Sequence, residues 1–280
     1  MTKKTKKWIK WFMISFGSLL TIIIILAIIF NQLTFRVLFG LGYLDIYYGN
    51  NDRGNNIMKY AVSKIKKDDG QIYHGLSVQN TKNGNYDIAI AALDKALEIN
   101  PKETSAYYGW VLLYYYHDYE RSLTLLEQYD SYTPDFQDAP MGEDIHYLKG
   151  LAQMQLKNYQ SAINEFDTYI NHLDSTHGEA YVDVYTFVQK GRCLSQLGQF
   201  EEAINAYKRA IRNYEECTEA YYYMGLTQVK MNDTDSACIN FNTALTLIND
   251  GYNSSDTYVE YFHEIYPQQI ENSIAQNCLE

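Results

Sequence analysis

Residues that interrupt regular structure are scarce in this sequence. Only 4 of its 280 residues are proline, whereas 46% are hydrophobic and 20% are charged. Proline ends helices and is confined to the edges of sheets, so its scarcity favours long regular elements. The apolar fraction is that of ordinary globular proteins and well above that of disordered segments. We therefore expect a folded chain of one or two domains.

Motifs of the common enzyme classes are also missing. The sequence has no G-x-S-x-G, no G-x-x-x-x-G-K-[S/T], no glycine-rich dinucleotide loop and no H-E-x-x-H. Its six histidines form no cluster with cysteine at the spacing of a zinc site. His172 and His177 flank Asp174, but a solvated loop is a better interpretation of this stretch than a metal site. The sequence thus predicts a protein that is not an enzyme, with no cofactor, no metal and no small-molecule substrate.

Positive charge is scarce and is concentrated at the N-terminus. The chain has 23 lysine and arginine residues against 34 aspartate and glutamate residues, for a net charge of −11. The first ten residues contain five lysines and no acid, so the remaining 270 residues carry a net charge of −16. A domain this acidic repels phosphate backbones, which argues against a nucleic-acid partner.

Cysteine is rare as well, with only Cys193, Cys217, Cys238 and Cys278 in the chain. A disulfide such as Cys238–Cys278 is compatible with a location outside the cytoplasm. Four reduced thiols are equally compatible with the sequence, because spacing does not assign the pairing of four cysteines.

One long apolar run stands out against this background. Residues 11–30 read WFMISFGSLLTIIIILAIIF and contain no charge. A helix of this length spans a bilayer core of about 30 Å. Trp8 and Trp11 lie at its start, where indole rings favour the membrane interface. The alternative, a cleaved signal peptide, has a shorter apolar region and a cleavage site of small residues, and neither is found here. We expect an uncleaved single-pass transmembrane helix.

The flanking charges predict the orientation of this helix. Five lysines precede it, and Arg36 is the one basic residue that closely follows it. Positively charged flanks remain in the cytoplasm, so the N-terminus is expected inside and the chain from about residue 31 onward outside. The predicted location is the cytoplasmic (inner) membrane of a bacterium, with an extracytoplasmic domain.

A pattern of about 34 residues recurs five times downstream. In each copy a residue that follows a polar turn precedes a small residue by three positions and a large apolar residue by seven. These triplets are Tyr86, Ala89 and Leu93; Tyr119, Ser122 and Leu126; Tyr159, Ala162 and Phe166; Phe200, Ala203 and Tyr207; Thr234, Ala237 and Phe241. Nine residues before each turn position stand Ser77, Trp110, Gly150, Gly191 and Gly225.

This pattern resembles the tetratricopeptide repeat (TPR) family. That family has a small residue in the first helix, a Gly-x-aromatic turn and A-x3-F in the second helix, and Pro101 and Pro134 match the proline that commonly closes a repeat. The resemblance implies an all-α fold, a TPR-type α-solenoid in which helical hairpins stack on one another. It also implies about six or seven extra residues after the second and third repeats, in turn-rich stretches at 133–140 and 172–178.

The remaining segments complete the predicted organisation. Val37–Tyr48 and Asn55–Ile65 read as a degenerate hairpin, and Ser255–Gln276 reads as a helix bent near Pro267 that caps the solenoid. The predicted segments are 1–10, basic and cytoplasmic; 11–30, transmembrane helix; 31–69, linker and degenerate hairpin; 70–250, five TPR-like repeats; and 251–280, capping helix and tail.

The resemblance also implies where a partner binds, because the first helices of successive repeats line the concave surface in this family. The positions carried over are His74, Val78, Tyr107, Tyr108, Val111, Tyr147, Leu151, Gln189, Arg192, Tyr222, Tyr223 and Leu226. They include few of the lysine, asparagine and arginine residues with which some relatives bind a terminal carboxylate. Tyrosine, 28 residues in all, supplies apolar rings with polar tips instead.

The predicted function is a membrane-anchored scaffold or adaptor whose tyrosine-rich groove binds a partner protein or peptide. The alternatives are a targeting receptor for precursor proteins, and an accessory subunit of a membrane enzyme or export complex. The receptor requires the opposite topology, with the repeats in the cytosol.

Overall fold

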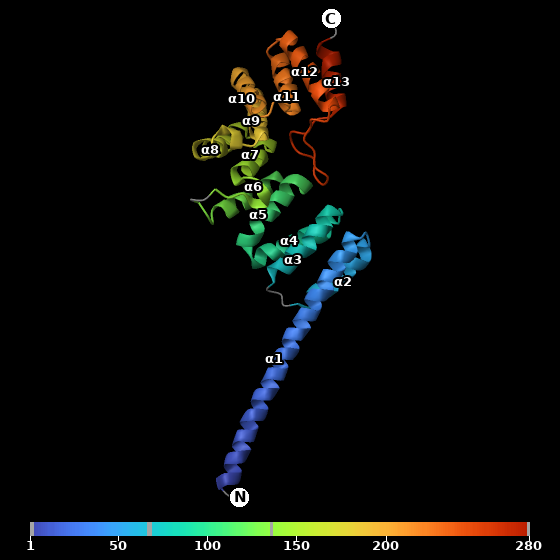
Figure 1. The fold of residues 1–280 in the computed structure, drawn as a ribbon, viewed down its shortest axis with the longest axis vertical. Coiled ribbons are helices and arrows are strands. Elements are labelled where there is room, and N and C mark those ends of the chain that lie inside the picture. Colours follow the sequence, from blue (N-terminus) through green and yellow to red (C-terminus); the bar gives the residue numbers. More distant parts are fainter. Residues whose placement is uncertain (1–2, 66–68, 135–136, 279–280) are drawn as a thin grey trace. The chain divides into compact units, whose positions relative to one another are not determined.

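The computed structural model describes residues 3–65, 69–134 and 137–278, and within these ranges every regular element is helical (Figure 1). The chain divides into two compact units, Met1–Thr104 and Ser105–Glu280. This architecture confirms the predicted all-α fold with helical hairpins.

Unit 1 contains α1 (Lys3–Tyr47), α2 (Asn51–Lys64), α3 (Gly70–Lys82) and α4 (Tyr86–Ile99). The prediction of a linker followed by a separate helix at Val37 is wrong, because α1 is a single helix of 45 residues. No proline interrupts it, and its two glycines near residue 40 leave the helical backbone intact.

The C-terminal part of α1 forms a close-packed hairpin with α2. A Cβ atom on Gly42 would lie 2.8 Å from the carbonyl oxygen of Gly54, and a Cβ atom on Gly54 would lie 2.6 Å from the carbonyl oxygen of Gly42. Only glycine allows two backbones to approach this closely. Ile46 and Met58 are buried beside this contact with Leu76 of α3, which joins α1 to the first repeat within unit 1.

In the N-terminal part of α1, the side chains that the structure describes lie outside the protein core. Every described side chain from Phe16 to Phe30 is exposed. Among the described residues, α1 is the one helix whose length and composition suit a membrane span, although a signal sequence near an N-terminus has the same properties.

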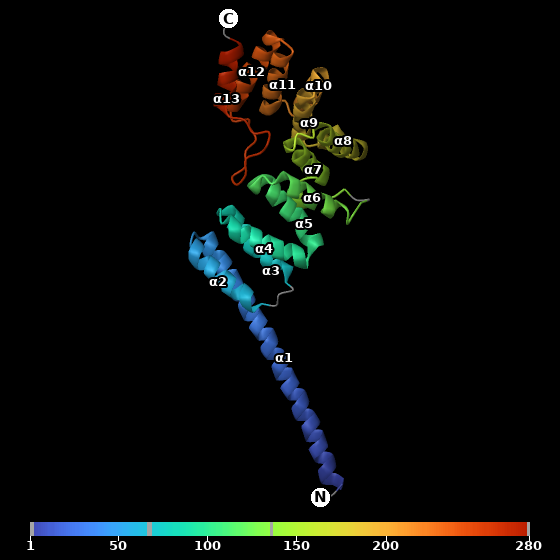
Figure 2. The same cartoon turned by 180° about the vertical axis from the view of Figure 1, so that it is seen from behind.

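Unit 2 is a series of helical hairpins (Figure 2). α5 (Pro101–Val111), which crosses the boundary between the units, continues as a π-helix (Leu112–Tyr116). The remaining helices are α6 (Tyr119–Asp130), α7 (Ile145–Gln155), α8 (Tyr159–Thr176), α9 (Val184–Gln196), α10 (Phe200–Asn213), α11 (Thr218–Lys230), α12 (Thr234–Asn249) and α13 (Pro267–Asn277). Short 3-10 helices lie at Pro140–Gly142 and Glu179–Tyr181.

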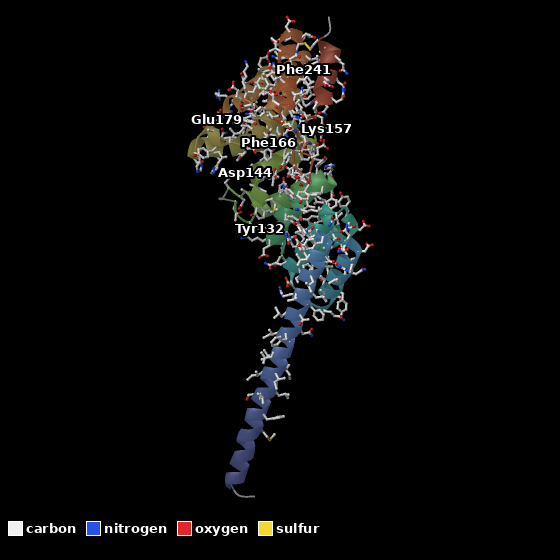
Figure 3. The ribbon with its side chains drawn as sticks, turned by 45° about the vertical axis from the view of Figure 1, so that its right-hand side comes forward. Tyr132, Asp144, Lys157, Phe166, Glu179 and Phe241 are labelled. Carbon is white, nitrogen blue, oxygen red and sulfur yellow. A yellow bond between two sulfur atoms is a disulfide. The ribbon has the colours of Figure 1, made fainter. Side chains whose placement is uncertain are left out.

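Each hairpin is held by a small residue of its first helix packed against a large residue of its second. A Cβ atom on Gly191 of α9 would lie only 2.5 Å from the ring of Tyr207 in α10. A Cβ atom added to Gly150 would lie 2.5 Å from the ring of Phe166, and one added to Gly225 would lie 2.6 Å from the ring of Phe241. Figure 3 labels both phenylalanines. These three rings are buried, so the hairpin interior has no room for a larger residue.

The second hairpin keeps this contact in a shifted register. The sequence pattern placed Trp110 at the close approach, but the structure places Gly109 there, 2.9 Å from Cγ of Leu126 when a Cβ atom is added. The π-helix between Leu112 and Tyr116 accommodates one additional residue, after which the first helix ends at His117 in the left-handed conformation. The predicted register was therefore wrong by one residue in this repeat.

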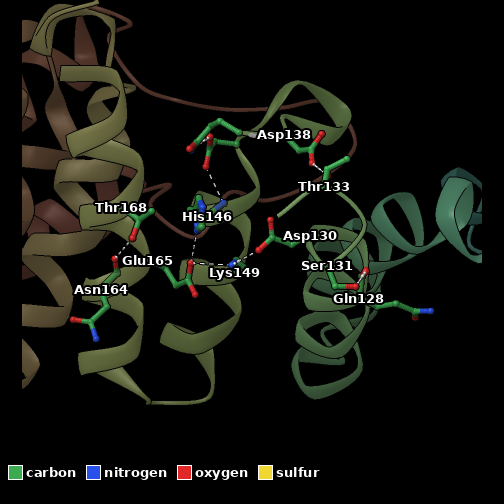
Figure 4. A network of polar contacts seen from close by, with 12 residues as sticks. Gln128, Asp130, Ser131, Thr133, Asp138, His146, Lys149, Asn164, Glu165 and Thr168 are labelled. Carbon is green, nitrogen blue, oxygen red and sulfur yellow. Dashed lines mark hydrogen bonds and ion pairs between the residues drawn. The ribbon is translucent and has the colours of Figure 1, made fainter. Parts of the chain in front are cut away.

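A buried lysine links α6, α7 and α8 (Figure 4). Nζ of Lys149 lies 2.9 Å from Oδ2 of Asp130 and 3.2 Å from Oε2 of Glu165. Nδ1 of His146 lies 2.7 Å from the same Glu165 oxygen. Burial lowers the pKa of Lys149, but the two carboxylates more than offset this effect and raise the pKa above its usual value. The pairing keeps the buried ammonium charged and connects neighbouring hairpins.

Two predicted segments differ in the structure. The stretch at 172–178 was expected to be a loop, but α8 continues to Thr176, and Glu179 then accepts hydrogen bonds from Arg209, Arg212 and Asn213 of α10. The helix expected over Ser255–Gln276 begins only at Pro267, which occupies the first helical position.

We expect Gly191→Ala to lower the free energy of unfolding of unit 2 by about 1–3 kcal/mol, because the added methyl group displaces the Tyr207 ring. This loss outweighs the higher helix propensity of alanine, about 1 kcal/mol. Urea unfolding followed by circular dichroism measures the effect. Gly40→Ala is the matched control, since its Cβ atom meets nothing within 4 Å. A Gly191→Ala chain as stable as this control would contradict the packing described above.

Candidate protein-binding face

Residues 252–266, here called the returning segment, connect α12 to α13 and run back along the first helices of unit 2 (Figures 1 and 2). The segment has no helix, and its middle, residues 255–258, is exposed. We call the surface that it contacts the first-helix face. This face consists of Tyr114 and His117 with Tyr119 of the adjoining α6, Tyr185, Gln189 and Arg192 of α9, and Thr218, Glu219 and Tyr223 of α11.

Phe262 packs into a group of rings from the second hairpin. Its ring centroid lies 5.4 Å from that of Tyr114 in a stacked arrangement, 6.1 Å from Tyr119 and 6.4 Å from His117. All three residues lie at or next to the π-helix, which is the irregular part of this hairpin. Stacked and edge-to-face ring pairs add binding energy beyond the area they bury.

His263 is the most deeply buried ring of the returning segment, with 3% of its surface exposed. Its ring stacks on Tyr185 at 3.8 Å and on Tyr261 at 5.3 Å, with an interplanar angle of 10° in both pairs. Nδ1 lies 3.4 Å from Nε2 of Gln189, and Nε2 lies 3.0 Å from Oγ of Ser254. These contacts fit a neutral ring that accepts from Gln189 and donates to Ser254.

The face also contacts the backbone of the segment. Nη1 of Arg192 donates to the carbonyl oxygen of Phe262 and, at 2.8 Å, to Oε1 of Gln189. The guanidinium group lies 4.5 Å from the ring centre of Tyr223, in the geometry of a cation–π contact. Glu219 accepts a hydrogen bond of 2.7 Å from the backbone N–H of Ser254. Contacts to backbone groups are a common way to bind an extended peptide.

Both ends of the returning segment are anchored by the fold. At the first end, the hydroxyl of Thr218 donates to the carbonyl oxygen of Tyr252. At the second end, Ile265 and Ile270 are buried with Phe241. A disulfide joins Cys238 of α12 to Cys278, which directly follows α13.

The other two cysteines, Cys193 and Cys217, are free and buried. Burial raises the pKa of both thiols to about 12. They therefore remain protonated and unreactive at neutral pH.

The residues predicted for partner binding separate into two groups. Gln189, Arg192 and Tyr223 contact the returning segment directly. The others lie mainly in the packing between helices: Tyr107, Tyr108, Tyr147, Leu151 and Tyr222 are buried, and Leu226 is half-buried against the Phe241 cluster. Of the positions carried over outside the first group, His74 and Val78 lie in α3 of unit 1, and Val111 is buried.

The sequence pattern missed the residues that hold Phe262 and stack on His263. Tyr114 lies in the π-helix, and Tyr119 begins the second helix of its hairpin, so neither occupies a standard first-helix position. Tyr185 lies four residues before Gln189, one turn away on the same face of α9. That spacing is the one signal in the sequence from which Tyr185 was predictable.

A half-buried carboxylate supports the Phe262 contact. Glu143 accepts hydrogen bonds of 2.7 Å from the indole N–H of Trp110 and from the hydroxyl of Tyr114. Burial raises the pKa of Glu143 above its usual value, and the two donated hydrogen bonds partly offset this effect. The pair of bonds fixes the orientation of the Tyr114 ring on which Phe262 stacks.

A pocket of about 170 Å³ lies beside Arg192, between the turn at Lys157 and α9, and is smaller than a typical small-molecule site. A larger, open pocket of about 820 Å³ lies beside the disulfide, between the start of α12 and the end of α13. No group of three or more histidine, cysteine, aspartate or glutamate residues suited to a metal ion occurs in the described part of the chain.

The stacked hairpins define an α-solenoid repeat protein. Protein-family models described as tetratricopeptide repeat match residues 70–103, 143–171 and 219–247, and a family model described as TPR repeat matches residues 191–232. The chain thus contains tetratricopeptide repeats, as the sequence pattern predicted. A search of curated proteins found no match.

Solved structures of repeat proteins are similar in fold. A MamA fragment from Desulfovibrio magneticus RS-1 is 19% identical, with a TM-score of 0.54 over 65% of this chain and 96% of that chain. YrrB, described as a TPR protein with an unusual peptide-binding site, is 19% identical, with a TM-score of 0.50 over 69% and 93%. The Cut9–Hcn1 hetero-tetramer of the APC/C is 12% identical, with a TM-score of 0.55 over 89% and 43%. At these identities the similarity shows the fold alone.

The stability of the chain is expected to depend on pH through His263. Burial, reinforced by the positive charge of Arg192, lowers its pKa from the ordinary 6.5 to about 3. The unfolded chain therefore binds a proton below pH 6.5 that the folded chain excludes. The stabilisation that the neutral His263 provides is fully present above pH 6.5 and is lost as the pH falls toward 3, by about 1–2 kcal/mol at pH 5.

The measurement compares urea unfolding of the wild-type chain and the His263→Gln variant at pH 7.5 and pH 5. Carboxylates with raised pKa values, such as Glu143 and Glu219, titrate in both chains, so their effect cancels in the comparison. Between the two pH values the wild type should lose about 1–2 kcal/mol more than the variant. Equal losses would show that His263 is accessible to protons in the folded chain.

Proposed function

We propose that this protein is a membrane-anchored scaffold whose repeats bind an extended segment of a partner protein on the first-helix face of unit 2. The observation that carries the proposal is that this face already binds non-helical polypeptide. Arg192 donates to the backbone carbonyl of Phe262, and Tyr185 stacks on the His263 ring. The same groups have the chemistry to bind a segment of another chain. The role proposed is binding rather than catalysis.

Three features support anchoring with the repeats outside the cytoplasm. The uncharged run at residues 11–30 is long enough to span a bilayer core of about 30 Å, and its described side chains from Phe16 to Phe30 are exposed. Five lysines precede this run in the sequence. The Cys238–Cys278 disulfide suits an oxidising compartment, which favours a scaffold outside the cytoplasm over a receptor with cytosolic repeats.

An alkaline phosphatase fused after Glu280 should therefore be active in a bacterial host, because this enzyme folds only outside the cytoplasm. A green fluorescent protein fused at the same position should be dark. Labelling of thiols in denatured, unreduced protein checks the same point, since Cys238 and Cys278 should resist the reagent. An inactive phosphatase fusion together with a fluorescent protein fusion that is bright would place the repeats in the cytoplasm and favour the targeting receptor.

Partner binding is tested with two variants of α9. Arg192→Met removes the charged donor from the first-helix face, whereas Lys190→Met removes a lysine that pairs with Asp167 of α8. The two positions are two residues apart and so point to nearly opposite sides of the helix. After cross-linking in cells and purification from solubilised membranes, Arg192→Met should recover less partner than the wild type, because the charged hydrogen bond to the partner is lost.

Lys190→Met should recover the partner at the wild-type yield. If Arg192→Met also does so, the first-helix face is not the binding surface. The identity of the partner decides between a scaffold and an accessory subunit. Purification of an accessory subunit recovers one membrane enzyme or export complex, whereas purification of a scaffold recovers several proteins.

A further inference from the structure

The contacts of the returning segment differ along its length. From Ile265 onward it is held by apolar burial, by α13 and by the disulfide to Cys238, which are the features of a structural core. Residues 259–263 are held by ring stacking and by hydrogen bonds from polar side chains, and Val259, Tyr261 and Phe262 pack against the core of the repeats while staying partly exposed. The two portions are therefore separable, because losing the second set of contacts leaves the first intact.

The residues that bind 259–263 are unusual choices for a structural contact. Gln189 is fully buried and Arg192 is half-buried, and both direct polar atoms at the segment. A core is stabilised more simply by apolar side chains, since buried polar groups must keep their partners. When 259–263 leaves, these groups regain water or a second peptide, so the face is suited to exchange one polypeptide for another.

We infer that residues 259–263 are a tethered ligand that occupies the first-helix face until a partner segment with the same pair of rings displaces it. The partner then presents a bulky aromatic residue in place of Phe262 and a histidine in place of His263, on a non-helical backbone. The inference rests on the proposed function, because it describes how that same surface is controlled.

Tethering sets the strength of this control. A ligand held at both ends has an effective concentration on the order of 1 mM at its site. A segment whose free form has a dissociation constant of about 100 µM then occupies the face about nine-tenths of the time. The apparent dissociation constant of a competing peptide is therefore about tenfold higher than its intrinsic value.

The experiment uses the full-length chain and a fluorescent synthetic peptide of residues 254–264. In an opened variant, Phe262→Ala/His263→Ala, the anchor at Ile265 and the disulfide are retained. Tyr252→Ala/Thr257→Ala changes two exposed side chains of the same segment and is the matched control. The opened variant should bind the peptide with an apparent Kd at least about tenfold lower than the wild type or the control.

Two further changes test the recognition itself. A peptide with alanine in place of both rings should not bind the opened variant. Arg192→Met in the opened background should weaken binding at least about tenfold, as expected for a lost charged hydrogen bond. An opened variant that is folded by circular dichroism but binds no peptide would overturn the inference, as would equal binding by the opened and wild-type chains.

Hydrogen exchange of the wild-type chain provides a test that needs no variant. Peptide at several millimolar should speed exchange of the backbone amides at 259–264, because it displaces the tethered copy. Unchanged exchange at saturating peptide would count against the inference. Failure of the proposed function looks different: the peptide binds the opened variant, but cross-linking in cells recovers no partner with either the wild-type or the opened chain.

Discussion

The contact between a small residue of one helix and a large residue of the next is the constraint on which this structure depends. Glycine at 150, 191 and 225 brings the rings of Phe166, Tyr207 and Phe241 against the helix backbone, which sets the spacing of each hairpin. The second hairpin keeps the contact at Gly109 although its first helix has an extra residue. The π-helix absorbs that residue, and Tyr114 within it contacts Phe262. A packing requirement inside the hairpin thus places an irregularity at the candidate binding face.

A solenoid of hairpins leaves its last helix and its first-helix face uncovered. The C-terminal residues cover both in unit 2, in different ways. α13 packs on α12 through apolar side chains and is joined to it by the disulfide, whereas the returning segment binds the first-helix face through rings and polar groups. A permanent cap and an exchangeable contact therefore lie side by side in one stretch of chain.

Unit 1 uses the same packing rule for a different purpose. Gly42 and Gly54 allow α1 and α2 to lie in backbone contact, so the exposed apolar helix is continuous with a hairpin that packs on the first repeat. No flexible linker separates them among the described residues, because α1 is helical from Lys3 to Tyr47. The orientation of the apolar helix is therefore coupled to that of the first repeat.

The sequence by itself determined the repeat and the start of each second helix, at Tyr86, Tyr119, Tyr159, Phe200 and Thr234, because a periodic core leaves a periodic pattern. The sequence indicates only some of the turns. Glycine marks the left-handed backbone at Gly84 and Gly198, but His117, Lys157 and Asn232 adopt the same conformation because the hairpin imposes it. Only the tertiary structure decided that residues 255–266 are not helical. Their apolar spacing suits a helix, but His263 and Ile265 are buried by partners far away in the chain, Gln189 among them at a separation of 74 residues. Contacts this distant leave no local pattern, which is why the position of the returning segment on the first-helix face was not predictable from the sequence, although Gln189, Arg192 and Tyr223 of that face were.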